Sequence, residues 1–70
     1  FMPDKYDHHN ALIACAQYRK LPDNRKPQLV SAYNVCSAIA VAHATGEPVT
    51  ISYDDFESAC FAIDHEFTKE

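Results

Sequence analysis

Apolar residues recur along the chain in three stretches, and two short polar breaks separate them. The stretches cover about residues 4–20, 28–45 and 53–67. In the first and third stretches, apolar residues return every three or four positions, which is typical of helices that bury one face. We therefore predict an all-α fold, a three-helix bundle, in a single small domain that covers residues 1–70.

The first predicted helix, 4–20, begins with Asp4, whose carboxylate suits a helix N-cap. It ends near Leu21, because Pro22 disfavours helical geometry in the residue before it. One side of the helix carries the stripe that we expect to be buried, namely Tyr6, His9, Leu12, Ile13, Ala16 and Lys20. Further apolar residues lie off this stripe: Ala11, Cys15 and Tyr18.

The second predicted helix, 28–45, opens with Pro27 in its first turn and ends at Gly46, which favours the left-handed cap conformation. No residue from Pro27 to Gly46 carries a formal charge. The length of this run raises the question of a membrane span. Polar residues interrupt the run and alanine dominates its apolar content, so we instead predict a central helix that is buried on most of its sides.

The third predicted helix, 53–67, follows a short extended connector at 49–51. Ser52 is a suitable N-cap, and Ile51 and Phe56 are spaced to pack across the helix start as a hydrophobic staple. The expected buried stripe is Phe56, Ala59, Cys60, Ile63 and Phe67. Phe61 falls on the opposite face and therefore points to solvent.

The stretch TISYDDF, 50–56, resembles the exit of an EF-hand calcium loop. Aligning Asp55 with the last loop position puts Ala44, Gly46 and Pro48 at earlier ligand positions, and none of these has a side-chain oxygen. Calcium needs about six or more oxygen ligands. The segment is therefore interpreted as a helix cap and not as a metal site.

The cysteines and the N-terminal residues indicate the cellular compartment in which the chain would act. The three cysteines are odd in number and widely spaced, unlike the disulfide framework of a small secreted protein, so we expect a reduced, cytoplasmic protein. Phe1 precedes Met2, and we interpret Phe1 as a remnant of cloning. No basic segment followed by an apolar one is found near Met2, so no secretory signal is expected.

Candidate chemical groups do not form a familiar catalytic or metal-binding pattern. The histidines and cysteines that could bind a metal lack the short paired spacing of zinc sites: His8, His9, His43, His65, Cys15, Cys36 and Cys60. Cys36 and His43 share one helical stripe but lie two turns apart, too far for a direct hydrogen bond. We expect no enzymatic activity, no cofactor and no bound metal.

The polar break at 18–26 concentrates positive charge in a chain whose net charge is −4. Its residues could contact a phosphate or nucleic acid: Tyr18, Arg19, Lys20, Arg25 and Lys26. The alternative is an ordinary solvated turn with cations at a helix C-terminus. Another alternative reverses the charge, so that the acidic third helix mimics DNA and inhibits a nucleic-acid enzyme.

The excess of apolar surface favours association with protein. We expect a homodimer formed through the first two helices, unless the N-terminal segment covers the second one. We further expect the third helix to present an aromatic side chain within a charged rim to a larger protein. This predicts a small adaptor, regulator or inhibitor whose partner-binding residues are Phe61, His65, Asp64, Glu57 and Ser58.

Overall fold

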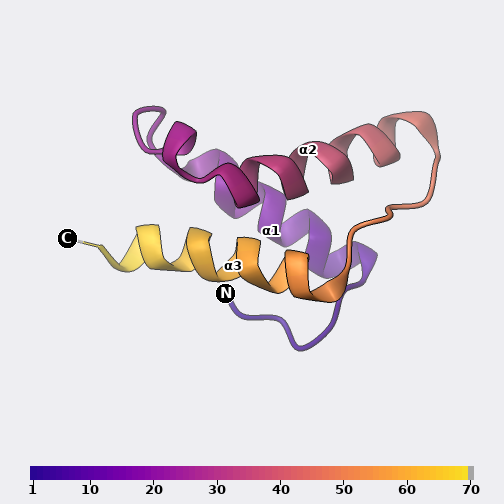
Figure 1. Cartoon of the computed structure of the whole chain (residues 1–70), viewed down its shortest axis with the longest axis horizontal. Coiled ribbons are helices and arrows are strands. Elements are labelled where there is room, and N and C mark those ends of the chain that lie inside the picture. Colours follow the sequence, from indigo (N-terminus) through magenta and orange to yellow (C-terminus); the bar gives the residue numbers. More distant parts are fainter. Residues whose placement is uncertain (70) are drawn as a thin grey trace.

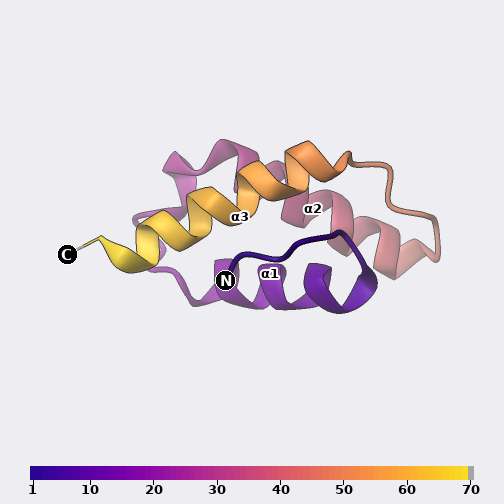
Figure 2. The ribbon, with the colours of Figure 1, turned by 90° about the horizontal axis from the view of Figure 1, so that it is seen from below.

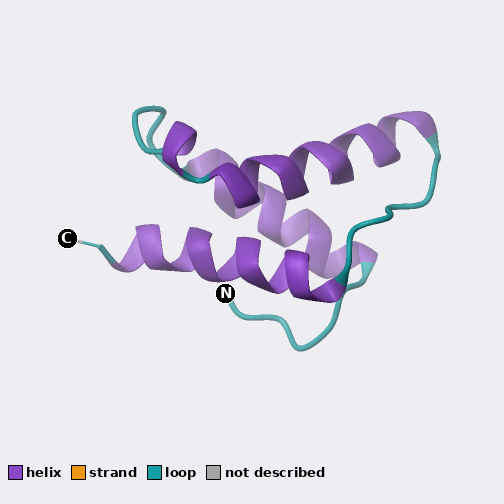
Figure 3. Cartoon of the chain, viewed as in Figure 1, coloured by secondary structure: helices purple, strands orange, loops and turns teal. Residues whose placement is uncertain are grey.

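The computed structural model of the chain describes residues 1–69. Within them the backbone forms three α-helices and no strand, as Figure 3 shows. The helices are α1 (His8–Lys20), α2 (Val30–Thr45) and α3 (Tyr53–Thr68), and a 3-10 turn, η1 (Lys26–Gln28), precedes α2. Each helix packs on the other two. The prediction of an all-α three-helix bundle is confirmed.

The N-terminal segment passes between α1 and α3, on the side of the bundle away from α2 (Figures 1 and 2). Contacts made by Pro3 and Tyr6 help to fix it to α3. The Tyr53 hydroxyl donates a hydrogen bond to the Pro3 carbonyl at 3.1 Å. The Tyr6 ring meets the Phe56 ring edge-on, with centroids 4.9 Å apart. The segment therefore leaves the outer face of α2 uncovered.

The N-cap of helix α1 lies three residues later than the sequence indicated. The N-cap is Asp7, not Asp4: Asp7 has an extended backbone, and its carboxylate accepts a hydrogen bond from the Asn10 N–H at 2.8 Å. A helix that began at Asp4 would include the extended segment that places the Tyr6 ring against the Phe56 ring. The tertiary contact therefore selects between two aspartates that are equivalent in local sequence.

The buried face of α1 differs from the predicted stripe. Ala11, Ala14 and Cys15 are buried, and Tyr18 packs against the same core, whereas Leu12 is exposed. The prediction grouped positions by their helical spacing and put Leu12 inside. The helix instead turns its smaller residues inward, because small side chains let the axes of α2 and α3 come close to the axis of α1.

Helix α2 also begins later than predicted, but it ends as expected. Pro27 lies in the 3-10 turn, and Leu29, with φ −101° and ψ 68°, interrupts the helical backbone before Val30. The Leu29 side chain packs against the core, which accounts for this break. At the other end Gly46 has φ +74°, the left-handed cap conformation that glycine adopts without strain.

The prediction that α2 is buried on most sides is wrong. The helix buries a single face, formed by Ala32, Val35, Cys36, Ile39 and Ala42. Three large apolar residues on its other side are 63%, 58% and 62% exposed, namely Val30, Tyr33 and Val41. Two helices of similar length cannot surround a third, and the N-terminal segment that could have covered α2 lies elsewhere.

Helix α3 follows the prediction closely at its start. The Ser52 hydroxyl accepts a hydrogen bond from the Asp55 N–H at 3.1 Å, and Ile51 joins the same core as Phe56. The predicted stripe is wrong at its last position, because Phe67 is 43% exposed and Glu66 is only 4% exposed. The Arg25 guanidinium donates to the Glu66 carbonyl at 3.3 Å, so the basic connector between α1 and α2 covers this turn of α3.

Each helix contributes one cysteine to the core: Cys15, Cys36 and Cys60. Cys36 and Cys15 share a hydrogen bond, which raises the pKa of Cys36, with burial adding to the shift, and lowers that of Cys15. Burial raises the pKa of Cys60 to about 11. All three cysteine side chains are buried.

Burial of the thiols predicts slow chemical modification. In native protein near neutral pH, we expect a thiol reagent such as DTNB to react only as fast as the bundle opens, because the cysteine side chains are shielded. In urea, all three thiols should react at once. Rapid reaction of one thiol in the native protein would contradict the described packing.

Glu66 provides a test of the energetics of the core. Its Oε2 accepts a hydrogen bond from Lys69 Nζ at 3.2 Å, and the two side chains form an ion pair. Its buried Oε1 has no hydrogen-bond partner among the described residues. Glu66→Met keeps the volume and removes both oxygens, so the free energy of unfolding should rise by about 1 kcal/mol. Urea denaturation measures this change.

Lys69→Met is the matched control for that substitution. It removes the ion-pair partner and leaves the Glu66 carboxylate buried, so it should destabilise the protein. A fall in stability with Glu66→Met would show that the carboxylate has a stabilising partner that the described contacts omit.

Candidate functional site

The predicted partner-binding residues lie on the outer side of α3. Phe61 is 56% exposed, Ser58 and His65 are exposed, and Glu57 and Asp64 are half-buried. On a helix, residues three and four positions from Phe61 surround its side chain. The structure therefore brings the five predicted residues together on one surface, with the aromatic ring in the middle.

Hydrogen bonds and ion pairs hold the two carboxylates of this surface in place. The Tyr53 hydroxyl donates to Glu57 Oε2 at 3.3 Å. Desolvation and the nearby Glu57 carboxylate raise the pKa of Tyr53, so this phenol keeps its proton at neutral pH. Asp64 Oδ1 pairs with the amino group of Phe1 at 2.9 Å. The Tyr53 hydroxyl therefore orients Glu57, whereas the pairing of Asp64 depends on the amino group of Phe1, which we interpret as a remnant of cloning.

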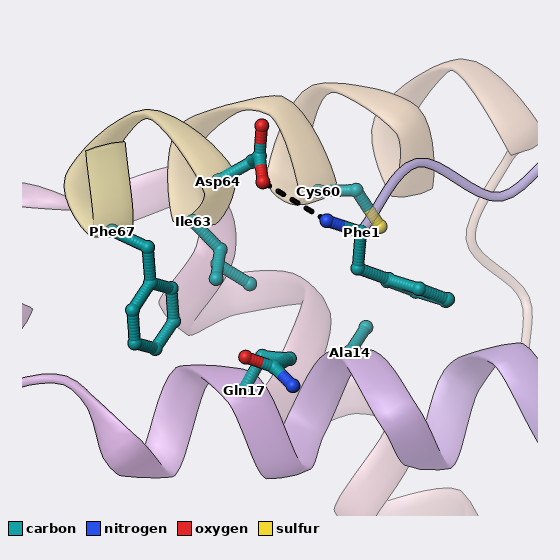
Figure 4. A pocket seen from close by; sticks show the side chains of 7 residues that line it. All are labelled: Phe1, Ala14, Gln17, Cys60, Ile63, Asp64 and Phe67. Carbon is teal, nitrogen blue, oxygen red and sulfur yellow. Dashed lines mark hydrogen bonds and ion pairs between the residues drawn. The ribbon is translucent and has the colours of Figure 1, made fainter.

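The Phe1–Asp64 pair closes a small pocket between α1 and α3, drawn in Figure 4. Its volume is about 80 Å³, well below the roughly 300–1,000 Å³ of most small-molecule sites. The walls include Cys60 and Asp64, with Gln17 and Phe67 on the remaining sides. The pocket has titratable groups but little room for a substrate.

The basic connector has a structural role in this fold. The Lys26 ammonium donates to the Arg19 carbonyl at 3.1 Å and to Asp23 Oδ1 at 3.3 Å, which caps the C-terminal end of α1. Arg25 similarly donates to the Glu66 carbonyl near the end of α3. Lys26 Nζ also lies 6.0 Å from the centroid of the Tyr18 ring.

These contacts bear on each predicted nucleic-acid residue. Arg25, Lys26 and Tyr18 are engaged within the bundle, whereas Arg19 and Lys20 are exposed in the last turn of α1. Their cationic side chains complement the helix dipole there. The geometry therefore supports the solvated-turn interpretation for most of the connector.

Two residue pairs between α1 and α2 were not predicted from the sequence. The His8 and His43 rings stack with centroids 5.5 Å apart and planes inclined by 21°. The second pair is Cys15 with Cys36. In both pairs the two residues are equally far from the middle of the connector, as expected for antiparallel neighbours joined by a short turn. That symmetry is the sequence signal that could have found them.

A second surface, the outer face of α2, stands out from the burial pattern. Its large apolar residues Val30, Tyr33 and Val41 are exposed. A groove of about 510 Å³ lies at its N-terminal end, and its lining residues are Tyr18, Asp23, Lys26, Pro27, Val30 and Tyr33. Another, of about 380 Å³, runs past Val41 towards Pro48. This surface is more apolar than the one around Phe61.

Residues 1–69 contain neither a candidate metal cluster nor a helix suited to a membrane. No group of three or more His, Cys, Asp or Glu side chains is arranged to hold a metal ion there. None of the helices in this part of the chain combines the length and the apolar character needed to cross a membrane.

The chain was also compared with known proteins. No family model, no curated protein and no solved structure matched it.

Proposed function

We propose that this chain is a non-enzymatic protein-interaction module that binds a larger protein through the outer surface of α3. The observation that carries the proposal is the exposure of Phe61, at 56%, between the partly accessible carboxylates of Glu57 and Asp64. Buried aromatic anchors with a surrounding charged rim are typical of binding hot spots.

The charge of this surface specifies the chemistry of the partner. Asp54, Glu57 and Asp64 lie on the turns around Phe61, and His65 and Ser58 add hydrogen-bonding groups. A complementary partner has an apolar pocket for the phenyl ring and Lys or Arg side chains around it. Binding a larger protein in this way suits an adaptor, a regulator or an inhibitor.

The size of the pocket beside Cys60 and the protonated state of its thiol argue against catalysis at that place. The pocket beside Cys60 and Asp64 holds about 80 Å³, and the pKa of Cys60 is raised to about 11 by burial. A thiol that keeps its proton and has no room for substrate is a poor nucleophile.

Two finer parts of the proposal concern location and stoichiometry. The unpaired cysteines suit a reducing compartment, so we propose a cytoplasmic protein. The uncovered outer face of α2 supports self-association as a homodimer.

The proposal predicts that Phe61→Ala abolishes partner capture without unfolding the chain. The phenyl ring is exposed, so its removal should change the free energy of unfolding by less than about 0.5 kcal/mol, as for ordinary surface substitutions. Immobilised wild-type protein should capture one specific protein from an extract of the source cells, and immobilised Phe61→Ala should not capture it. Capture of that protein should also weaken as salt rises, because the rim is acidic.

Leu12→Ala is the matched control, since Leu12 is an exposed apolar residue on α1. It should leave capture intact. Equal capture by the wild type and by Phe61→Ala would contradict the proposal, as would a large loss of stability in Phe61→Ala, which would show that the ring belongs to the core.

A further inference from the structure

The outer face of α2 presents an uncharged apolar surface along the whole helix. Val30, Tyr33, Ser37, Ala40, Val41 and Ala44 share this side of the 16-residue helix at spacings of three and four. No Asp, Glu, Lys or Arg occurs between Val30 and Thr45. Another helix can therefore approach along the full length of α2 without burying a charge.

We propose that the occupant of this face is a second copy of the chain, bound with its α2 antiparallel to the first and with Ser37 on the two-fold axis. Ser37 lies at the middle of the helix, between Tyr33 and Val41. A two-fold interface is self-complementary, because each residue meets its counterpart across the axis. The proposal uses α2, so it stands independently of the function assigned to α3.

The order of large and small side chains fits this register. With Ser37 on the axis, Tyr33 of one copy faces Val41 of the other, since both lie one turn from the centre. Val30 similarly faces Ala44, which gives a large residue a small one to pack against. The small Ser37 at the crossing point lets the two helices come close together.

Charges at the two ends of α2 select the antiparallel orientation. Lys26 lies in the turn before the helix and Glu47 follows the cap residue after it. Antiparallel packing brings Glu47 of each copy next to Lys26 of the other, whereas parallel packing would bring like charges together. Lys26 has three donor protons and uses two within its own chain. In this arrangement the dipoles of the two α2 helices also point in opposite directions, which favours antiparallel packing.

The grooves at both ends of the face extend the contact. Antiparallel packing places the end of α2 near Val41 and Pro48 over the groove beside Tyr18 and Pro27 of the other copy. A helix of this length is only about 24 Å long. The interface is therefore at the small end of the known range, and we expect a dissociation constant in the micromolar range.

The first test measures solution mass by light scattering from about 1 µM to about 1 mM, which brackets that affinity. Wild-type protein should pass from monomer to dimer. Tyr33→Lys should raise the dissociation constant roughly a hundredfold, because each dimer loses two aromatic contacts. Leu12→Lys, on α1, is the control and should dimerise normally. A monomer at every concentration, or a dimer that survives Tyr33→Lys, overturns the proposal.

The second test locates the two-fold axis by disulfide cross-linking. Only a residue near the axis meets its own copy, so Ser37→Cys should form a covalent dimer rapidly under mild oxidation. Ser58→Cys, exposed on α3, is the control and should cross-link slowly. The native cysteines are buried and contribute little. Faster cross-linking of Ser58→Cys than of Ser37→Cys overturns the proposal.

The third test checks the orientation through its charges. Glu47→Lys should weaken dimerisation roughly tenfold, because the symmetry repeats the change in both copies. Lys26→Glu combined with Glu47→Lys should restore the affinity if the two residues face each other. Equal affinities for the wild type and Glu47→Lys contradict the antiparallel register. The fold of each variant is checked by its helical circular dichroism.

Discussion

Close packing of small side chains at the helix contacts is the constraint on which the other features depend. Alanine or cysteine fills most of the places where the three helices meet, as at Ala14, Ala32 and Cys60, and Phe56 is the one large residue that is fully buried in the described chain. A core of this kind is thin. Side chains larger than valine or isoleucine have few places inside it, so the chain carries much of its apolar surface outside.

The two proposed binding surfaces follow from that displacement of apolar residues. Helix α2 has apolar residues on all sides, but α1 and α3 can cover only one of them, which leaves Tyr33 and its neighbours in solvent. Helix α3 has a strong inner stripe and a single outward aromatic residue, Phe61, among acidic side chains. The first surface suits packing against an uncharged helix, and the second suits a basic partner. One small bundle can therefore pair with itself and bind another protein at the same time.

The positions of the helices could be predicted from sequence, but their orientation around the core could not. Pro22, Gly46 and Ser52 end or begin helices through local backbone effects, and the structure confirms all three. The face of α1 was wrong because helical spacing favours Leu12, whereas close approach of the helices favours alanine. The start of α1 and the burial of Glu66 were missed because contacts with distant residues, Phe56 and Arg25, decide them. Phe61 and the four residues around it needed only helical periodicity, so they were correctly placed on one surface.

The thin core leaves the outer face of α2 free to contact protein. The most direct measurement is a set of amide and side-chain NMR spectra recorded over a dilution series, because chemical shifts report each residue separately. The account predicts that concentration-dependent shifts concentrate at Val30, Tyr33, Ser37 and Val41, with the buried face of α2 nearly unchanged. Shifts confined to α3, or spectra that do not change with concentration, would contradict it.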